Sequence, residues 1–258
     1  MKIALLGYGK MGKAIEALAL ERGHQIGAVV DDASQWPDQE QKVKGCDVAI
    51  EFSMPSTAVD NIHRCFALHI PIVVGTTGWY DQLETIVEQC KREQQSLFVA
   101  SNFSIGMNIM FDLNRRLAHL MSRYPEYKAD ISETHHVHKL DAPSGTAITL
   151  ANDMIAANPH YNQWSLCDEV WIDANGAVDN NKSTHPHPQV EANEIPIHSE
   201  RRGEVAGIHS VVYDSAVDTI TLSHSAKSRR GLALGAMIAA EFVQHKQGYF
   251  TMRDLIND

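Results

Sequence analysis

The sequence predicts an α/β fold: a doubly wound parallel sheet with an inserted α+β domain that contains a mixed or antiparallel sheet. Between residues 2 and 100, short apolar runs alternate with helical segments, the pattern of parallel strands joined by crossover helices. The alternation stops after Ser104, and an apolar helix at 232–243 could pack back on the first domain. We therefore expect a first domain of residues 1–104 completed by 229–258, and a second of residues 105–228.

The first strand, expected at residues 2–6, leads into a glycine-rich turn, Gly7-Tyr8-Gly9-Lys10-Met11-Gly12. Gly7 would allow the tight turn out of the strand, and Gly9 would let the backbone approach a pyrophosphate. Gly12 would let the following helix pack closely on the sheet. In this position the glycines are typical of a turn that binds a dinucleotide.

The next elements support this interpretation. A helix is expected to end near Arg22, and a strand at 25–30 ends in Asp31-Asp32. Asp31 lies about 20 residues beyond the glycines, where an acid binds the adenine ribose of NAD. The first domain is therefore expected to be a Rossmann-type nucleotide-binding domain.

Two more polar turns are expected on the same edge of the sheet. Further strands are predicted at 48–52, 71–74 and 97–100, with one helix that opens at Pro55 and Ser56 and another at 82–94. The last two strands end in Gly75-Thr76-Thr77-Gly78 and Ala100-Ser101-Asn102-Phe103. Ligands bind outside the carboxyl ends of such strands, so we expect these turns to flank a nicotinamide ring.

The second domain has a different pattern. A long helix is expected at 105–123, a strand at 129–134, a helix at 146–157, and from Val170 antiparallel strands at 195–198, 205–213 and 219–225. For two further motifs we favour a structural interpretation over a binding site. The His185-Pro-His187-Pro motif is read as a polar loop, so no metal is expected. Arg201-Arg202-Gly203-Glu204 is read as a hairpin turn in preference to a basic contact near the active site.

Composition excludes several classes of protein. The 258 residues include 44% hydrophobic and 21% charged residues, as in ordinary globular proteins. The formal charge of -10 argues against a nucleic-acid partner. Since no apolar run reaches the roughly 18–20 residues of a membrane helix, we expect neither a membrane span nor a signal peptide. The four scattered cysteines are typical of a reduced, cytoplasmic protein.

One stretch is especially rich in ionisable side chains: Glu133-Thr134-His135-His136-Val137-His138-Lys139-Leu140-Asp141-Ala142-Pro143-Ser144-Gly145-Thr146-Ala147. Three histidines, one lysine and two carboxylates fall within its first nine residues. The turn before the helix would present backbone N–H groups to a carboxylate or phosphate. By itself, the stretch fits a catalytic loop for an anionic substrate and a polar surface loop equally well.

This stretch, the glycine turn, the two later polar turns and the Ser228-Arg229 segment together resemble the 4-hydroxy-tetrahydrodipicolinate (dihydrodipicolinate) reductase family of the diaminopimelate route to lysine. The resemblance spans the whole chain and is weakest at residues 160–195. It implies NAD(P)H-dependent reduction of a small cyclic imine dicarboxylate, and a homotetramer that associates through the sheet of the second domain.

The resemblance also implies residue roles. His135 and Lys139 stand at the catalytic proton-transfer positions. The substrate-binding candidates are His136, Ser144, Gly145, Thr146 and Arg229. The cofactor-binding candidates are Gly7, Tyr8, Gly9, Lys10, Met11, Gly12, Asp31, Gly75, Thr76, Thr77, Ala100, Ser101, Asn102 and Phe103. Glu133 and Asp141 are expected to orient and balance the cations, and His138 has no assigned role.

The chemistry fits these residue types. Hydride attack on a conjugated imine ring develops negative charge, which the ammonium of Lys139 can stabilise and protonate. Many relatives carry an arginine after the ribose-binding acid, where this chain has Asp32. Although Lys10 could attract a phosphate, we expect NADH to be preferred and NADPH tolerated.

Two alternatives stay open. Another NAD(P)-dependent two-domain dehydrogenase, such as a semialdehyde enzyme, would need a nucleophilic cysteine in an active-site loop. A non-catalytic NAD(H)-sensing protein would keep the glycine turn but would not need His135 or Lys139.

Overall fold

The computed structural model describes residues 1–173, 175–186 and 189–258. These form two compact units, one of Met1–Asn108 with Arg229–Asp258 and one of Ile109–Ser228. His187 of the proline-flanked histidine pair lies outside the described residues. No helix in the described ranges is long and apolar enough to cross a membrane.

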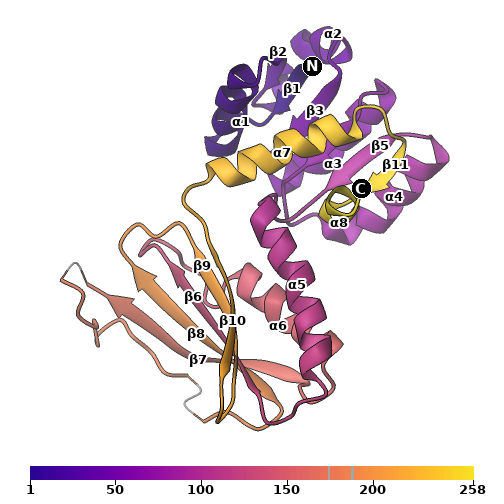
Figure 1. Cartoon of the computed structure of the whole chain (residues 1–258). Coiled ribbons are helices and arrows are strands. Elements are labelled where there is room, and N and C mark those ends of the chain that lie inside the picture. Colours follow the sequence, from indigo (N-terminus) through magenta and orange to yellow (C-terminus); the bar gives the residue numbers. More distant parts are fainter. Residues whose placement is uncertain (174, 187–188) are drawn as a thin grey trace. The chain divides into compact units, whose positions relative to one another are not determined.

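The first unit, described without gaps, is built on a six-stranded parallel sheet in the order β11-β5-β4-β3-β1-β2 (Figure 1). Its strands are β1 (Lys2–Leu6), β2 (Gln25–Val30), β3 (Val48–Glu51), β4 (Ile72–Val74), β5 (Ser96–Val99) and β11 (Gly248–Phe250). Its helices are α1 (Lys10–Glu21), α2 (Trp36–Lys44), α3 (Pro55–Ala67), α4 (Leu83–Arg92), α7 (Arg230–Val243) and α8 (Met252–Ile256), with short 3₁₀ turns η1 (Ala33–Gln35) and η2 (Tyr80–Gln82).

Helices cover both faces of this sheet. Ile3 and Leu5 of β1 pack with the buried residues of α1 and α7, whereas Ala4 and Leu6 pack with those of α2, α3 and α4. Because both faces are buried, the strands are continuous apolar runs, as expected for a parallel sheet. The doubly wound fold is confirmed, and helix α7 returns from the end of the chain to this unit.

Three elements of the first unit are additions to the sequence prediction. Strand β11 has three residues and helix α8 has five, too few for a periodic pattern. Helix α2 buries only Trp36 and Val43 among charged and polar neighbours, so its apolar stripe is weak.

The described residues of the second unit form a five-stranded sheet in the order β10-β9-β6-β8-β7. Its strands are β6 (Lys128–His135), β7 (Gln163–Ile172), β8 (Glu194–Arg202), β9 (Ile208–Asp214) and β10 (Thr219–Ser225). Helix α6 (Gly145–Ala157) belongs to this unit, and α5 (Ile105–Met121) begins in the first unit and continues into the second.

This sheet is mixed, which confirms one of the two forms expected for the second domain. The expectation of antiparallel strands after Val170 is wrong for β8, which pairs parallel with both of its neighbours. Strands β6, β7 and β8 are mutually parallel, and β9 runs antiparallel to both of its neighbours, β6 and β10. A parallel partner needs a crossover of a dozen or more residues, which is the length of the polar stretch between β7 and β8. Strand β7 itself was not predicted.

The hairpin interpretation of residues 201–204 is also wrong. Arg201 and Arg202 are the last residues of β8, and β6 lies between β8 and β9. The segment therefore connects two strands that are not neighbours. Arg201 is consequently a strand residue whose side chain can point into the unit.

Side chains of β6 alternate between two environments. Ala129, Ile131, Glu133 and His135 are buried, whereas the residues between them are half-exposed. Helix α6 lies against the buried face and supplies Leu150 and Met154 to its interior. The last two buried positions of β6 are therefore polar residues at the carboxyl end of a strand.

Candidate active site

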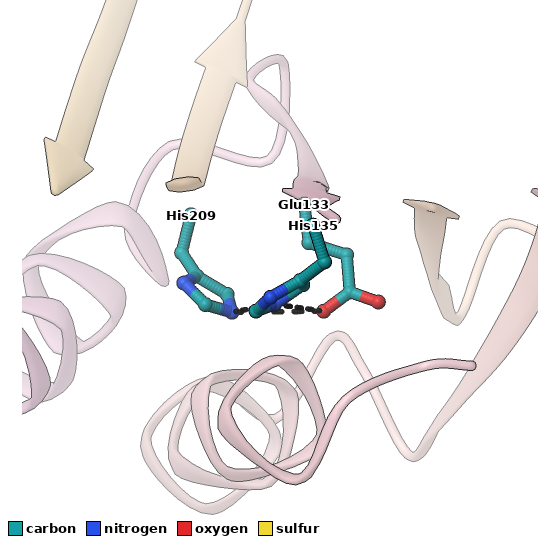
Figure 2. Close-up of side chains that lie close together, drawn as sticks. All are labelled: Glu133, His135 and His209. Carbon is teal, nitrogen blue, oxygen red and sulfur yellow. Dashed lines mark hydrogen bonds and ion pairs between the residues drawn. The ribbon is translucent and has the colours of Figure 1, made fainter. Parts of the chain in front are cut away.

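A buried acid and two imidazoles meet at the end of β6 (Figure 2). The Nε2 atoms of His135 and His209 lie 3.3 Å apart. Oε2 of Glu133 lies 3.5 Å from Nε2 of His135 and 3.6 Å from Nε2 of His209. Strand register explains the meeting, because Glu133 of β6 pairs with His209 of β9.

The carboxylate of Glu133 is fully buried and held by donors. Its Oε1 accepts hydrogen bonds from the Ser144 backbone N–H at 3.0 Å and the Ser199 hydroxyl at 2.9 Å. Burial by itself would raise the pKa of Glu133, but hydrogen bonds from His135, His209, Ser144 and Ser199 hold the pKa well below its usual range. Glu133 is therefore an anion at neutral pH.

The imidazole of His209 is neutral at neutral pH. Burial lowers its pKa, the hydrogen bond to Glu133 opposes that change, and the neighbouring His135 lowers the pKa further. Its Nε2 also lies 3.2 Å from the Ser144 hydroxyl. A neutral imidazole thus lies between a carboxylate, a second imidazole and a hydroxyl.

Arg201 connects this cluster to the loop after β6. Its side chain has no exposed surface, and Nη1 lies 3.7 Å from Oε1 of Glu133. On the other side, Nε lies 3.4 Å from Oε1 of Glu169. Nη2 donates a 2.7 Å hydrogen bond to the carbonyl oxygen of Asp141. The buried guanidinium therefore balances Glu133 and anchors the loop.

The loop after β6 presents Lys139 and directs His138 elsewhere. Nζ of Lys139 donates to both carboxylate oxygens of Asp141 at 2.8 Å, and the lysine side chain is 20% exposed. His138 pairs with Glu204 at 2.9 Å, and both side chains are mostly exposed. His136, two residues before His138, is half-buried. The structure thus pairs the predicted catalytic lysine with an acid and leaves His138 on the surface.

Helix α6 begins immediately after the loop. Ser144 is its N-cap, and the Ser144 hydroxyl accepts from the Ala147 N–H at 3.2 Å. Gly145 and Thr146 are the first helical residues, whose N–H groups have no partner inside a helix. Three of the predicted substrate-binding residues therefore lie together at a helix N-terminus, where an anion is favoured.

The first unit contains a cleft of about 260 Å³ around the glycine turn. The cleft is lined by Gly7, Tyr8, Gly9, Val30, Asp31, Asp32, Ala33, Phe52, Ser53, Met54, Thr57 and Asn61. Gly7 has φ +91°, and a Cβ there would lie 2.2 Å from the Phe52 carbonyl oxygen. A Cβ on Gly9 would meet no described atom within 4 Å, so Gly9 leaves its backbone open.

Asp31 and Asp32 have different surroundings. Oδ1 of Asp31 accepts a 2.7 Å hydrogen bond from the Tyr8 N–H, which brings the acid to the glycine turn. Asp32 caps η1 through the Ser34 N–H at 2.9 Å. Both acids line the cleft, and Asp31 is the one that is hydrogen-bonded to the glycine turn.

The other predicted cofactor residues lie at two neighbouring strand ends. Residues 75–77 follow β4 and residues 100–103 follow β5, and these strands are adjacent in the sheet. The Thr76 hydroxyl accepts from the Ser53 N–H at 2.9 Å, and Asn102 Oδ1 accepts from the Ser104 N–H at 2.9 Å. Lys10 and Met11 begin α1, beside the cleft's glycine turn. Arg229, predicted to bind substrate, is an exposed residue at the start of α7 in the first unit.

Sequence reasoning missed His209 and misread Arg201. His209 shares the strand phase of the buried Val211 and Tyr213. A histidine on the buried face of a strand was the signal that could have identified it, but such a residue is also common in ordinary cores. Its 74-residue separation from His135 leaves no local motif.

Three comparisons place the chain among known proteins. Residues 1–103 match the family model of the dihydrodipicolinate reductase N-terminus, and residues 106–256 match that of the C-terminus. The 4-hydroxy-tetrahydrodipicolinate reductase of Christiangramia forsetii is 44% identical over 258 residues, covering 100% of this chain and 98% of the relative. That of Staphylococcus aureus is 31% identical over 266 residues, covering 99% of this chain and 100% of the relative.

A solved structure shows the same fold. The dipicolinate-bound dihydrodipicolinate reductase from Paenisporosarcina sp. TG-14 matches with a TM-score of 0.75 at 23% identity, and the match covers 97% of each chain. The two family models together cover nearly all of this chain, and the relatives match it from end to end. The chain therefore belongs to the dihydrodipicolinate reductase family.

Proposed function

We propose that this protein reduces 4-hydroxy-tetrahydrodipicolinate to tetrahydrodipicolinate with hydride from NAD(P)H, in the diaminopimelate route to lysine. Its relatives at 44% and 31% identity carry the reductase name. The observation that carries the proposal is the loop from Glu133 to Ala147. There a buried imidazole at the end of one strand is followed by a lysine–carboxylate pair and an open helix N-terminus.

The first unit fits a dinucleotide cofactor. The cleft contains the turn whose Gly9 is open for close approach, and Asp31 lies against that turn. The glycine turn and Asp31 would hold the pyrophosphate and adenosine, and the turns after β4 and β5 would flank the nicotinamide. A bound nicotinamide cofactor supplies the hydride.

We propose that Lys139 is the proton donor and His135 the second proton-transfer group. Negative charge that develops on the ring during reduction would be stabilised by the ammonium of Lys139. Asp141 accepts two hydrogen bonds from that ammonium and so limits its rotation. Glu133 and His209 hold the imidazole of His135 at the strand end.

The carboxylates of the substrate would bind at the start of α6. Ser144, Gly145 and Thr146 offer a hydroxyl and backbone N–H groups in a positive helix dipole. His136 precedes Lys139 in the same loop and is half-buried. We include Arg229 as a further carboxylate ligand because it is an exposed cation at the start of α7.

Turnover is tested directly. Purified protein is mixed with NADH and the condensation product of pyruvate and aspartate semialdehyde, and absorbance of the reduced nicotinamide is followed. We expect oxidation that depends on both pyruvate and the semialdehyde. Absence of oxidation with either reduced cofactor would remove the reductase proposal and leave an NAD(H)-sensing role.

We expect NADH to be preferred and NADPH to be tolerated. The two carboxylates that follow β2 disfavour a 2′-phosphate, and both Asp31 and Asp32 line the cleft. Steady-state kcat/KM with each cofactor measures the preference. A preference of about tenfold (about 1.4 kcal/mol) for NADPH would contradict this assignment.

We also propose a cytoplasmic homotetramer. The sheet face opposite α6 carries half-exposed side chains such as Ser132, Thr134 and Val212, a surface suited to a second sheet. The four cysteines are buried free thiols, which suits a reducing compartment. Light scattering after size exclusion should give four times the chain mass of 28.6 kDa. A monomeric mass at micromolar concentration would contradict the tetramer.

A further inference from the structure

The cluster of Glu133, His135 and His209 has the geometry of a metal-ligand set. One carboxylate oxygen and two imidazole nitrogens lie close together, at separations of 3.3, 3.5 and 3.6 Å (Figure 2). In a tetrahedral zinc site with bonds of about 2.0–2.1 Å, neighbouring ligand atoms lie about 3.3–3.4 Å apart. The three potential ligand atoms are therefore spaced for one ion without a large movement of the strands.

The types of ligand also suit a zinc-class ion. Two histidines and one glutamate form a common set for zinc in catalytic sites, with a further position left for water or substrate. Imidazole nitrogens favour transition metals over magnesium and calcium, which prefer oxygen ligands. The cluster therefore selects for ions such as Zn²⁺ or Co²⁺.

The surroundings hold the ligands in position. Oε1 of Glu133 accepts from the Ser144 N–H and the Ser199 hydroxyl, and Oε2, which lies near both imidazoles, also accepts from the Ser144 N–H at 3.2 Å. The three residues come from two neighbouring strands, which are rigid supports for a site.

One feature opposes a cation. Nη1 of Arg201 lies 3.7 Å from Oε1 of Glu133, whereas the proposed ligand atom is Oε2 of the same carboxylate. Its positive charge weakens the field of Glu133 at the point between the imidazoles. This arrangement favours reversible binding over a permanently held structural metal.

We propose that Glu133, His135 and His209 form a reversible site for one zinc-class divalent cation, and that the bound ion inhibits the enzyme by occupying His135. Binding of the ion is independent of the proposed function. Only the inhibition rests on it, because it requires His135 to act in turnover. The site adds a metal where the sequence led us to expect none.

Calorimetric titration tests the binding. Chelator-treated full-length protein is titrated with ZnCl₂, and His209→Gln and His135→Gln are compared with wild type. The control is His160→Gln, because His160 is an exposed histidine of the same unit that contacts the Ser122 carbonyl. We expect one ion per wild-type chain, at least about tenfold weaker binding in the two cluster variants, and unchanged binding in the control.

The outcomes separate the possibilities. Equal zinc affinity in wild type and both cluster variants would overturn the site, as would loss of binding in His160→Gln alone. If a variant fails to fold, X-ray absorption of the wild-type zinc complex decides, since the proposal requires two imidazole nitrogens in the first coordination sphere. A sphere with no imidazole or one imidazole would overturn it.

Inhibition is measured separately in the reductase assay. Zinc at a free concentration equal to the dissociation constant from calorimetry should halve the rate of turnover, and a chelator should restore that rate. Zinc that binds the cluster without slowing turnover would overturn the inhibitory part. If the protein shows no turnover at all, the proposed function fails while the calorimetric result still stands.

Discussion

Lys139 and His135 occupy different surroundings, although only three residues lie between them in the sequence. Lys139 pairs with the carboxylate of Asp141, whose side chain is mostly exposed, so the ammonium lies near solvent. His135 is 9% exposed and faces Glu133 and His209. The ammonium is thus held by a partly exposed carboxylate, whereas the imidazole is held in a buried cluster.

At this scale we predict that Lys139→Ala and His135→Ala each lower kcat by about 10²-fold or more, the usual contribution of a general acid. His138→Ala is the matched control, because His138 lies in the same loop but pairs with Glu204 at the surface. Steady-state kinetics with saturating NADH measures all three. Near-normal turnover in the first two variants would refute the roles given to these residues.

At the scale of elements, Arg201 ties β8 to the loop after β6. We predict that Arg201→Met lowers the free energy of unfolding by about 3–5 kcal/mol, because Glu133 and Glu169 lose their buried cation. The adjacent Arg202→Met is the control. Its side chain is half-exposed and pairs with Glu200, so we expect a change within about 0.5 kcal/mol.

Urea denaturation monitored by circular dichroism measures both arginine variants. The folded fraction of Arg201→Met should also show reduced kcat, because the Asp141 carbonyl loses its anchor. Equal stability of the two variants would show that the buried guanidinium contributes no more than its surface neighbour.

A second prediction at this scale concerns a bridge across β6, β8 and β7. Nδ1 of His198 lies 2.7 Å from Asp168 and Nε2 lies 3.1 Å from Asp130. The hydrogen bond to Asp130 raises the pKa of His198 to about 9, against the effect of burial, and the bond to Asp168 adds to the rise. His198 is therefore protonated at neutral pH.

A raised pKa in the folded state stabilises the fold fully below the unfolded pKa of about 6.5, and the contribution fades as pH rises through about 9. We predict that His198→Gln destabilises the protein at pH 6 by about 1 kcal/mol or less, since the side chain is 39% exposed and solvent screens the pairs. Thermal unfolding of wild type and variant across this range should show the difference disappearing above pH 9. A difference independent of pH would contradict the charged bridge.

At the scale of the whole molecule, the two units differ in how much the sequence predicts. Five strands and the glycine turn of the first unit follow from local alternation, because each crossover joins strands close in sequence. In the second unit β6 pairs with β8 and β9. The residues in these contacts lie 60 or more positions apart in the sequence.

The candidate site divides in the same way. The loop from Glu133 to Ala147 is contiguous, so its lysine, histidines and helix N-cap could be predicted from residue order. Arg201 and His209 reach the same place only through strand pairing, and no local pattern distinguishes them from ordinary strand residues. Pairing of distant strands is decided by packing of the complete unit, which a single sequence does not display.

A final prediction follows from the proposal that the first unit binds the cofactor and the second binds the substrate carboxylates. Gly9 of the first unit and Gly145 of the second are both glycines at which an added Cβ meets no described atom within 4 Å, and neither has a positive φ. Alanine should therefore fold normally at either position, and any loss must come from a ligand that needs the space. We predict that Gly9→Ala weakens NADH binding at least tenfold (about 1.4 kcal/mol) and that Gly145→Ala leaves it unchanged.

The converse holds for the substrate, because Gly145 begins α6 where its carboxylates are proposed to bind. Gly145→Ala should raise KM for the substrate, while Gly9→Ala should raise KM for NADH. Fluorescence titration with NADH, steady-state kinetics and melting temperatures measure these effects. If Gly9→Ala retained full NADH affinity with an unchanged melting temperature, the cofactor would not approach the backbone of the glycine turn, and the placement of the pyrophosphate there would be wrong.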